Sequence, residues 1–137
     1  MSTPPQDAGN GRLTVLVVED AEDARDLYAM ILEDAGYRPR CTDTVASALE
    51  ALRSERIDAI LTDFNLPDGD GLTMLDAAEK EGSITEAIPV VLCTAWPMGG
   101  RGALRQVAKL LVKPVDPAAL VRAIREAIAA VRERQAS

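Results

Sequence analysis

The chain has 137 residues, of which 47% are apolar and 27% charged, a balance that suits one folded domain and is too short for two. Its formal net charge of −7 repels nucleic-acid phosphates, which argues against direct nucleic-acid binding. It contains no histidine, the commonest general base and transition-metal ligand, so zinc chemistry and serine–histidine hydrolysis are excluded.

The ends of the chain carry no targeting or membrane signal. No apolar run approaches the roughly 18 residues of a membrane span, and the N-terminus lacks the pattern of a signal peptide, so we expect a cytoplasmic protein without membrane contact. Residues 1–12 are rich in proline and glycine and predict a flexible tail. The folded domain is expected over 13–131, with 132–137 as a solvated helix end and nothing left for an output domain.

The first predicted elements are a buried strand and an amphipathic helix. Residues 13–18 form an aliphatic run typical of a parallel strand buried on both faces, and Glu19 and Asp20 follow at its carboxyl end. Apolar residues then recur at helical spacing over 24–35. Gly36 is placed to end this helix.

Two further strand–helix units follow. Residues 37–42 predict an edge strand, because Pro39 cannot donate to a ladder, and 45–52 predict its helix. Residues 57–62 form a third, buried strand that leads directly into Asp63. A loop whose turn formers are Pro67, Gly69 and Gly71 then precedes a helix over 72–80.

The last two units differ in how clearly they are marked. Residues 88–94 predict the fourth strand, but 96–102 are too rich in glycine for a regular assignment, so the fourth helix is expected to be short or irregular. Residues 110–113 form the fifth strand. Asp116 and Pro117 then mark the N-cap and first residue of a helix that runs to Val131.

This alternation predicts an α/β fold. Five strand–helix units with right-handed crossovers give a five-stranded parallel sheet with helices on both faces. Ligands of such sheets bind at the carboxyl ends of the strands, near the point where the strand order reverses. The residues that end strands are therefore the candidate functional residues.

Three acids, a hydroxyl and an ammonium group are expected at that edge: Glu19, Asp20, Asp63, Thr94 and Lys113. Carboxylates a few ångströms apart repel by roughly 3 to 4 kcal/mol per pair at an effective dielectric near 20, so a cation should bind among them. Hard oxygen ligands without histidine or thiolate suit Mg²⁺, which usually keeps open positions for phosphate oxygens.

Simpler interpretations exist for several of these residues. Asp20 could cap the first helix, and Glu19 could be its solvated neighbour. Thr94 suits a strand end in any case, and Lys113 could be a surface lysine before a loop. Asp63 is harder to explain structurally, because a carboxylate at the end of a buried strand is costly without a partner.

Four short motifs in order give the chain a resemblance to the response regulator receiver family over about 120 residues, each ending its own strand. They are Val17-Val18-Glu19-Asp20, the run from Asp63-Phe64-Asn65 through Pro67 to Gly71, Leu92-Cys93-Thr94-Ala95 and Val112-Lys113-Pro114-Val115. The resemblance is to a single-domain receiver like the chemotaxis regulators. It implies a flavodoxin-like fold and a signalling protein that catalyses only its own phosphorylation and dephosphorylation.

The resemblance also implies roles for individual residues. Asp63 would accept a phosphoryl group from a sensor histidine kinase or a phosphotransfer protein. Asp20, Asp63 and the backbone carbonyl of Asn65 would bind Mg²⁺, and Glu19 would reach it directly or through water. Thr94 and Lys113 would contact the phosphoryl oxygens, and the bond after Lys113 would be cis. The signal would pass to an unknown downstream protein.

The sequence departs from the family pattern in two places. Leu110 replaces the aromatic residue that usually lies three positions before the lysine, so the usual aromatic switch is missing or replaced. The segment between Thr94 and Lys113 is a few residues shorter than usual. Trp96, the single tryptophan, could be a packing residue, but our hypothesis places it beside the site, where it would slow hydrolysis of the acyl phosphate.

Two alternative functions remain open. A degenerate receiver would serve only as a binding module. A Mg²⁺-dependent phosphatase with an aspartate nucleophile would turn over free phosphoesters, but such enzymes carry an Asp-x-Asp motif after the first strand, unlike the adjacent Glu19 and Asp20 here.

Overall fold

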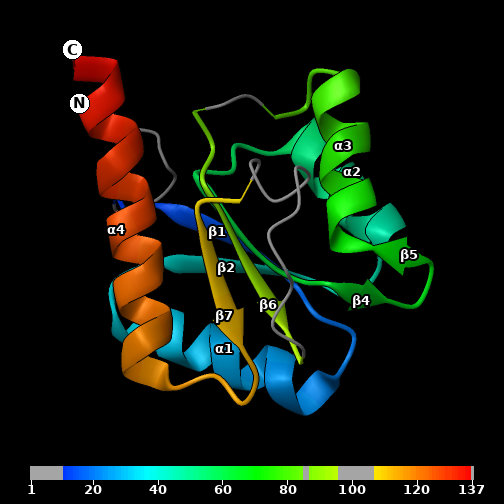
Figure 1. The fold of residues 1–137 in the computed structure, drawn as a ribbon, viewed down its shortest axis with the longest axis horizontal. Helices are drawn as coiled ribbons and strands as arrows, with labels where there is room; N and C mark the ends of the chain where they lie inside the picture. The colour runs from blue at the N-terminus through cyan, green and yellow to red at the C-terminus, as the bar shows by residue number, and fades with distance from the viewer. Residues whose placement is uncertain (1–10, 85–86, 96–106, 137) are drawn as a thin grey trace.

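The computed structural model describes residues 11–84, 87–95 and 107–136. Its centre is a parallel sheet of five strands in the order β2-β1-β3-β6-β7 (Figure 1). The chain passes from β1 outward to β2 and then returns to β3 on the other side of β1, which places the reversal of strand order between β1 and β3. The predicted five-stranded α/β fold is confirmed.

The strands of this sheet lie within two residues of their predicted bounds. They are β1 (Thr14–Val18), β2 (Arg38–Thr42), β3 (Ala59–Asp63), β6 (Val90–Thr94) and β7 (Lys109–Val112). Among the described strands, β2 pairs only with β1, as expected of an edge strand that contains Pro39. The central strands β1, β3 and β6 are buried along their whole length, as their aliphatic runs predicted.

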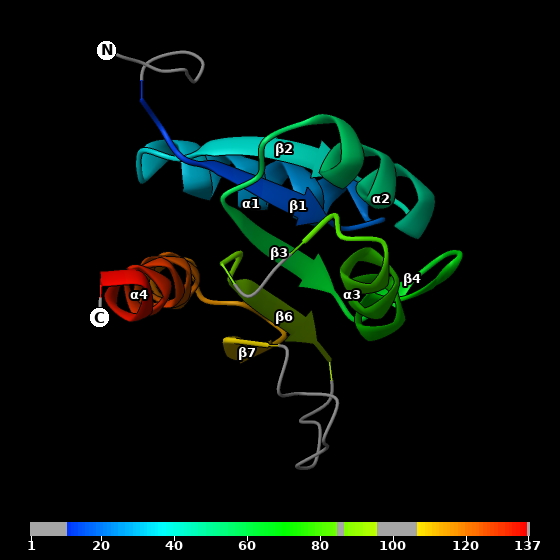
Figure 2. The same ribbon diagram turned by 90° about the horizontal axis from the view of Figure 1, so that it is seen from above.

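Four helices flank the sheet in the described part of the chain: α1 (Glu22–Asp34), α2 (Val45–Ser54), α3 (Gly71–Lys80) and α4 (Pro117–Ala136). None of them is long and apolar enough to cross a membrane. Successive residues of β1 point to opposite faces of the sheet: Val15 and Val17 pack with α1 and α4, whereas Leu16 and Val18 pack with α2 and α3. Figure 2 shows α4 on one side of the twisted sheet and α2 and α3 on the other.

Local signals account for several helix ends. Gly36 has a φ of +94°, the left-handed conformation expected of a glycine after a helix. Asp116 accepts a hydrogen bond from the Ala119 N–H at 2.9 Å, as an N-cap of α4 should. By contrast, Asp20 does not cap α1: the N-cap is Ala21, without a side-chain hydrogen bond.

One element was not predicted. The segment after Asp63, expected as a loop, contains a short antiparallel hairpin formed by β4 (Asn65–Leu66) and β5 (Gly69–Asp70). The fourth-helix region of 96–102 and the side chain of Trp96 lie outside the described residues, so those two expectations stay predictions.

Candidate functional site

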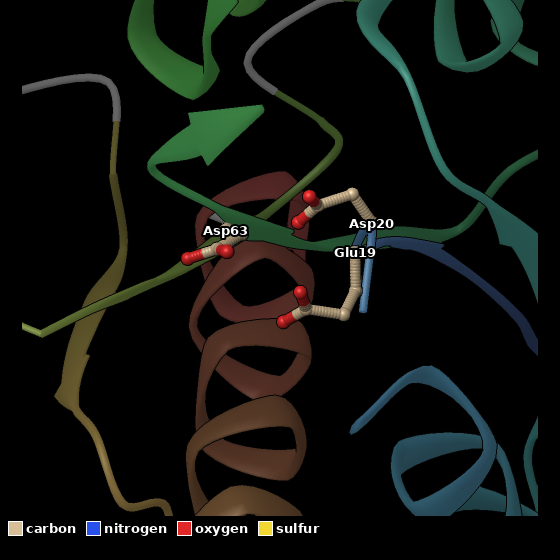
Figure 3. A group of neighbouring side chains, drawn as sticks. All are labelled: Glu19, Asp20 and Asp63. Carbon is tan, nitrogen blue, oxygen red and sulfur yellow. The ribbon is translucent and has the colours of Figure 1, made fainter. Parts of the chain in front are cut away.

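The candidate site lies at the carboxyl edge of the sheet, where β1 and β3 end side by side. Glu19 and Asp20 follow β1 directly, and Asp63 is the last residue of β3. This is the reversal point of the strand order, the position at which sheets of this type bind ligands. Figure 3 shows the three carboxylates together at this edge.

We call Glu19, Asp20 and Asp63 the acid cluster. One carboxylate oxygen from each residue lies within 4.8 Å of the others. Glu19 is buried with 1% of its surface exposed, Asp63 is 9% exposed, and Asp20 lies at the surface. The site is thus acidic, with Glu19 and Asp63 buried and Asp20 exposed to solvent.

Lys113 supplies the positive charge of the site. It follows β7 and places its Nζ 3.0 Å from Glu19 Oε1 and 3.0 Å from Asp63 Oδ2. Burial by itself would lower the pKa of Lys113, but the hydrogen bonds to Glu19 and Asp63 outweigh burial and raise it. The side chain therefore stays an ammonium ion at neutral pH, and it is not the free surface lysine of the simpler interpretation.

Glu19 is held by its neighbours as well as by Lys113. Its Oε2 accepts a hydrogen bond from the Ala21 N–H at 3.1 Å, which turns the chain into α1. Burial raises the pKa of Glu19 in spite of the lowering effect of the Ala21 and Lys113 hydrogen bonds. Sequence reasoning missed a further contact: the Arg25 Nη1 atom donates to the backbone carbonyl of Glu19 at 3.0 Å and lies 3.4 Å from that of Asp20.

Thr94 is the last residue of β6, the strand that pairs with β3. It is buried with 2% exposed and lies opposite Val112 of β7. The backbone N–H of Lys113 donates to the Thr94 carbonyl at 2.8 Å, which ties the two residues together. The peptide bond between Lys113 and Pro114 is cis, as the resemblance implied.

The candidate metal ligands of the acid cluster are carboxylate oxygen atoms. Cys93 lies opposite Asp63 in the sheet, but its side chain belongs to the apolar core, and burial raises its pKa to about 12. It is therefore a neutral thiol and a poor metal ligand. Among the described residues the group that could hold a metal consists of three carboxylates, and such oxygen ligands without imidazole or thiolate suit a hard divalent cation such as Mg²⁺.

Gly71, which the sequence analysis treated only as a turn former, makes a close backbone contact with Asp63. Gly71, the first residue of α3, is buried, and a Cβ placed on it would lie 2.6 Å from the backbone oxygen of Asp63. Its N–H donates to the Phe64 carbonyl at 2.7 Å. No larger residue fits without moving the strand end that carries Asp63.

Asn65 begins β4, two residues after Asp63, and is exposed.

Comparisons with known proteins agree with this geometry. The family model of the response regulator receiver domain matches residues 15–125. The phosphate regulon transcriptional regulatory protein PhoB of Escherichia coli is 33% identical over 114 residues, which cover 81% of this chain and 49% of that protein. The chain thus spans about half the length of that regulator. An uncharacterized 14.6 kDa protein of Leptolyngbya boryana is 31% identical over 121 residues, 84% of this chain and 89% of that protein.

Solved structures share the fold. A receiver domain protein, described as CheY-like, from Methanospirillum hungatei aligns with a TM-score of 0.79 at 22% identity, over 90% of this chain and 99% of that one. The chemotaxis response regulator CheY4 of Vibrio cholerae aligns with a TM-score of 0.77 at 24% identity, over 85% of this chain and 98% of that one. At these identities the similarity supports the fold alone.

Proposed function

Because the chain belongs to the response regulator receiver domain family, we propose that it is a phosphoacceptor of two-component signalling that carries the phosphoryl group on Asp63. The observation that supports this most directly is the position of the Asp63 carboxylate, which lies beside two other acids and 3.0 Å from the Lys113 ammonium. Of the three acids, Asp63 alone ends a central strand. Its backbone is fixed on both sides, by β6 and by Gly71.

The reaction is a transfer between two side chains. A carboxylate oxygen of Asp63 attacks the phosphorus of a phosphohistidine on the partner, the phosphorus–nitrogen bond breaks, and the departing imidazole takes up a proton. An acyl phosphate remains on Asp63. Such transfers depend on positioning and on neutralising the charge of the phosphoryl oxygens, more than on covalent chemistry by other residues.

The residues of the site divide this work between them. Asp20, Asp63 and the Asn65 carbonyl would hold Mg²⁺, with Glu19 reaching it directly or through water, and the ion would neutralise charge on the phosphoryl oxygens. Lys113, which bridges Glu19 and Asp63 before the reaction, would transfer one of these contacts to a phosphoryl oxygen. The Thr94 hydroxyl would donate to another.

The proposed partners are proteins. The donor would be a sensor histidine kinase or a phosphotransfer protein, and the output would be a change in binding to a downstream protein. PhoB is a longer protein, of which the 114 matched residues make up 49%, whereas the match to the Leptolyngbya boryana protein covers 89% of that protein.

Phosphorylation by a small acyl or amido phosphate in the presence of Mg²⁺ tests the proposal. Intact mass should rise by about 80 Da for the wild-type protein, the mass of one added phosphoryl group. Asp63→Asn should gain nothing, whereas Asp76→Asn should be labelled normally because Asp76 is an exposed α3 residue that pairs with Lys80. An unlabelled wild-type protein would favour the degenerate receiver, and steady release of phosphate from phosphoesters would favour the phosphatase.

A further inference from the structure

We propose that Asp68 is a positioning residue for the metal site, because it fastens the hairpin that carries Asn65 to the N-terminus of α2. The inference rests on the proposed function, in which the Asn65 carbonyl binds Mg²⁺. It concerns a residue outside the acid cluster that the sequence marks only as one acid in a turn. Its consequence is that contacts between Asp68 and α2 set the affinity of the site for Mg²⁺.

The carboxylate of Asp68 makes two hydrogen bonds to a helix that is distant in sequence. Oδ1 accepts from the Val45 N–H at 2.7 Å, and Oδ2 accepts from the Ala46 N–H at 3.1 Å. Val45 and Ala46 are the first residues of α2, whose N–H groups have no acceptor inside the helix. The hydrogen bond from Val45 helps to lower the pKa of Asp68, so the carboxylate is charged at neutral pH and faces the positive end of the helix dipole.

The hairpin also passes close to α2 at Gly69. A Cβ placed on Gly69, the residue after Asp68, would lie 3.3 Å from Val45 Cγ2. In Figure 1 the hairpin formed by β4 and β5 lies next to α2 and α3. Asp68 therefore joins two segments that lie close together, and it fixes their relative position through two hydrogen bonds.

Asn65 lies between this anchor and the base of the hairpin. At the base, the Gly71 N–H bonds to the Phe64 carbonyl at 2.7 Å, and within the hairpin Asn65 pairs with Asp70. Loss of Asp68 would leave the base closed but remove the two hydrogen bonds that hold the tip to α2. The Asn65 carbonyl would then sample more positions, and Mg²⁺ would bind more weakly because it demands near-ideal octahedral geometry.

The expected effect is moderate and specific. Removal of a group that bonds a metal ligand directly costs about 10- to 100-fold in affinity, and Asp68 acts one step further away, so we expect about a 3- to 10-fold rise in the Mg²⁺ dissociation constant of Asp68→Ala. Asp68→Asn keeps one acceptor oxygen and should fall between Asp68→Ala and the wild type.

Thr44→Ala provides the matched control, because Thr44 caps the same helix without contacting the hairpin through its cap. Its Oγ accepts from the Ser47 N–H at 3.0 Å, and the Ser47 hydroxyl accepts from the Thr44 N–H at 3.1 Å. Both variants weaken the start of α2, so a thermal melt should shift in both. Only Asp68→Ala should weaken Mg²⁺ binding measured by isothermal titration calorimetry.

The rate of phosphorylation by a small phosphodonor, measured against Mg²⁺ concentration, gives the second readout. Asp68→Ala should need more Mg²⁺ for half-maximal rate and recover the wild-type rate at saturating Mg²⁺. An unchanged dissociation constant in Asp68→Ala, or an equal rise in Thr44→Ala, would overturn the inference while leaving the proposed function intact. A wild-type protein that binds no Mg²⁺, or takes no phosphoryl group on Asp63, would overturn the proposed function and the inference with it.

Discussion

The acid cluster makes the metal-free protein sensitive to the charge of Asp63. Each pair of its carboxylates, at most 4.8 Å apart, repels by about 3.5 kcal/mol at an effective dielectric of about 20. The Lys113 Nζ atom, 3.0 Å from Asp63, attracts that carboxylate by about 5.5 kcal/mol on the same scale. The two repulsions on Asp63 thus exceed the single attraction by about 1.5 kcal/mol, and solvent screening of the exposed Asp20 reduces this to about 1 kcal/mol.

Asp63→Asn removes the charge at nearly constant volume, so we expect it to stabilise the metal-free protein by that amount. In a domain of this size the gain corresponds to a rise of about 3 to 5 °C in the melting temperature. Mg²⁺ should stabilise the wild-type protein by about 1.4 kcal/mol when its concentration is about ten times the dissociation constant. The substituted protein has lost one ligand charge, so Mg²⁺ should raise its melting temperature less.

Thermal melts of both proteins with a chelator and with Mg²⁺ complete a four-point cycle. Asp76→Asn removes one charge from an exposed position on α3 and serves as the control for net charge. It should show the same Mg²⁺ effect as the wild type. The reasoning about the clustered charges would be refuted if Mg²⁺ did not change the melting temperature of the wild type. It would also be refuted if metal-free Asp63→Asn were less stable than the metal-free wild type.

Four further predictions test other parts of the molecule. Lys113→Ala leaves the buried Glu19 carboxylate without its cation and should lower the free energy of urea unfolding by about 2 kcal/mol, with phosphorylation no longer changing the amide NMR spectrum near Thr94. Gly71→Ala places a Cβ against the Asp63 carbonyl and should cost about 1 to 3 kcal/mol in the same unfolding assay; unchanged stability would contradict the close contact. The pKa of Glu81 is lowered from 4.5 to about 2, first by the Arg53 hydrogen bond and then by Ser83, so its contribution is present above pH 4.5 and lost as pH falls toward 2. Melts of Glu81→Gln should therefore lie below the wild type at pH 7 and converge with it near pH 2. Trp96→Ala should lose its phosphoryl group faster than the wild type, and equal lifetimes would rule out shielding by the indole.

The sequence was sufficient to predict which residues meet in the acid cluster. Aliphatic runs identified β1 and β3 as buried parallel strands, and their carboxyl ends must share one edge of the sheet. Glu19, Asp63 and Lys113 were therefore expected at the same edge, and the strand order, in which β1 and β3 are neighbours, brings Glu19 and Asp63 together. The hydrogen-bond partners within the cluster could not be predicted from the sequence, because they depend on side-chain rotamers and burial.

Three aspartates that cap helices in the described part of the chain show which contacts a sequence encodes locally. Asp116 and Asp70 each precede the helix that they cap and accept an N–H from three residues later, so composition and spacing within a few residues are enough to find such caps. Asp68 caps α2, which begins 23 residues earlier in the chain. Nothing near Asp68 distinguishes it from a turn residue, and nothing near Val45 signals a missing cap, because Thr44 already supplies one. A cap of this kind forms only after folding of the sheet has brought the hairpin and α2 together. It therefore depends on the tertiary structure and cannot be predicted from local sequence.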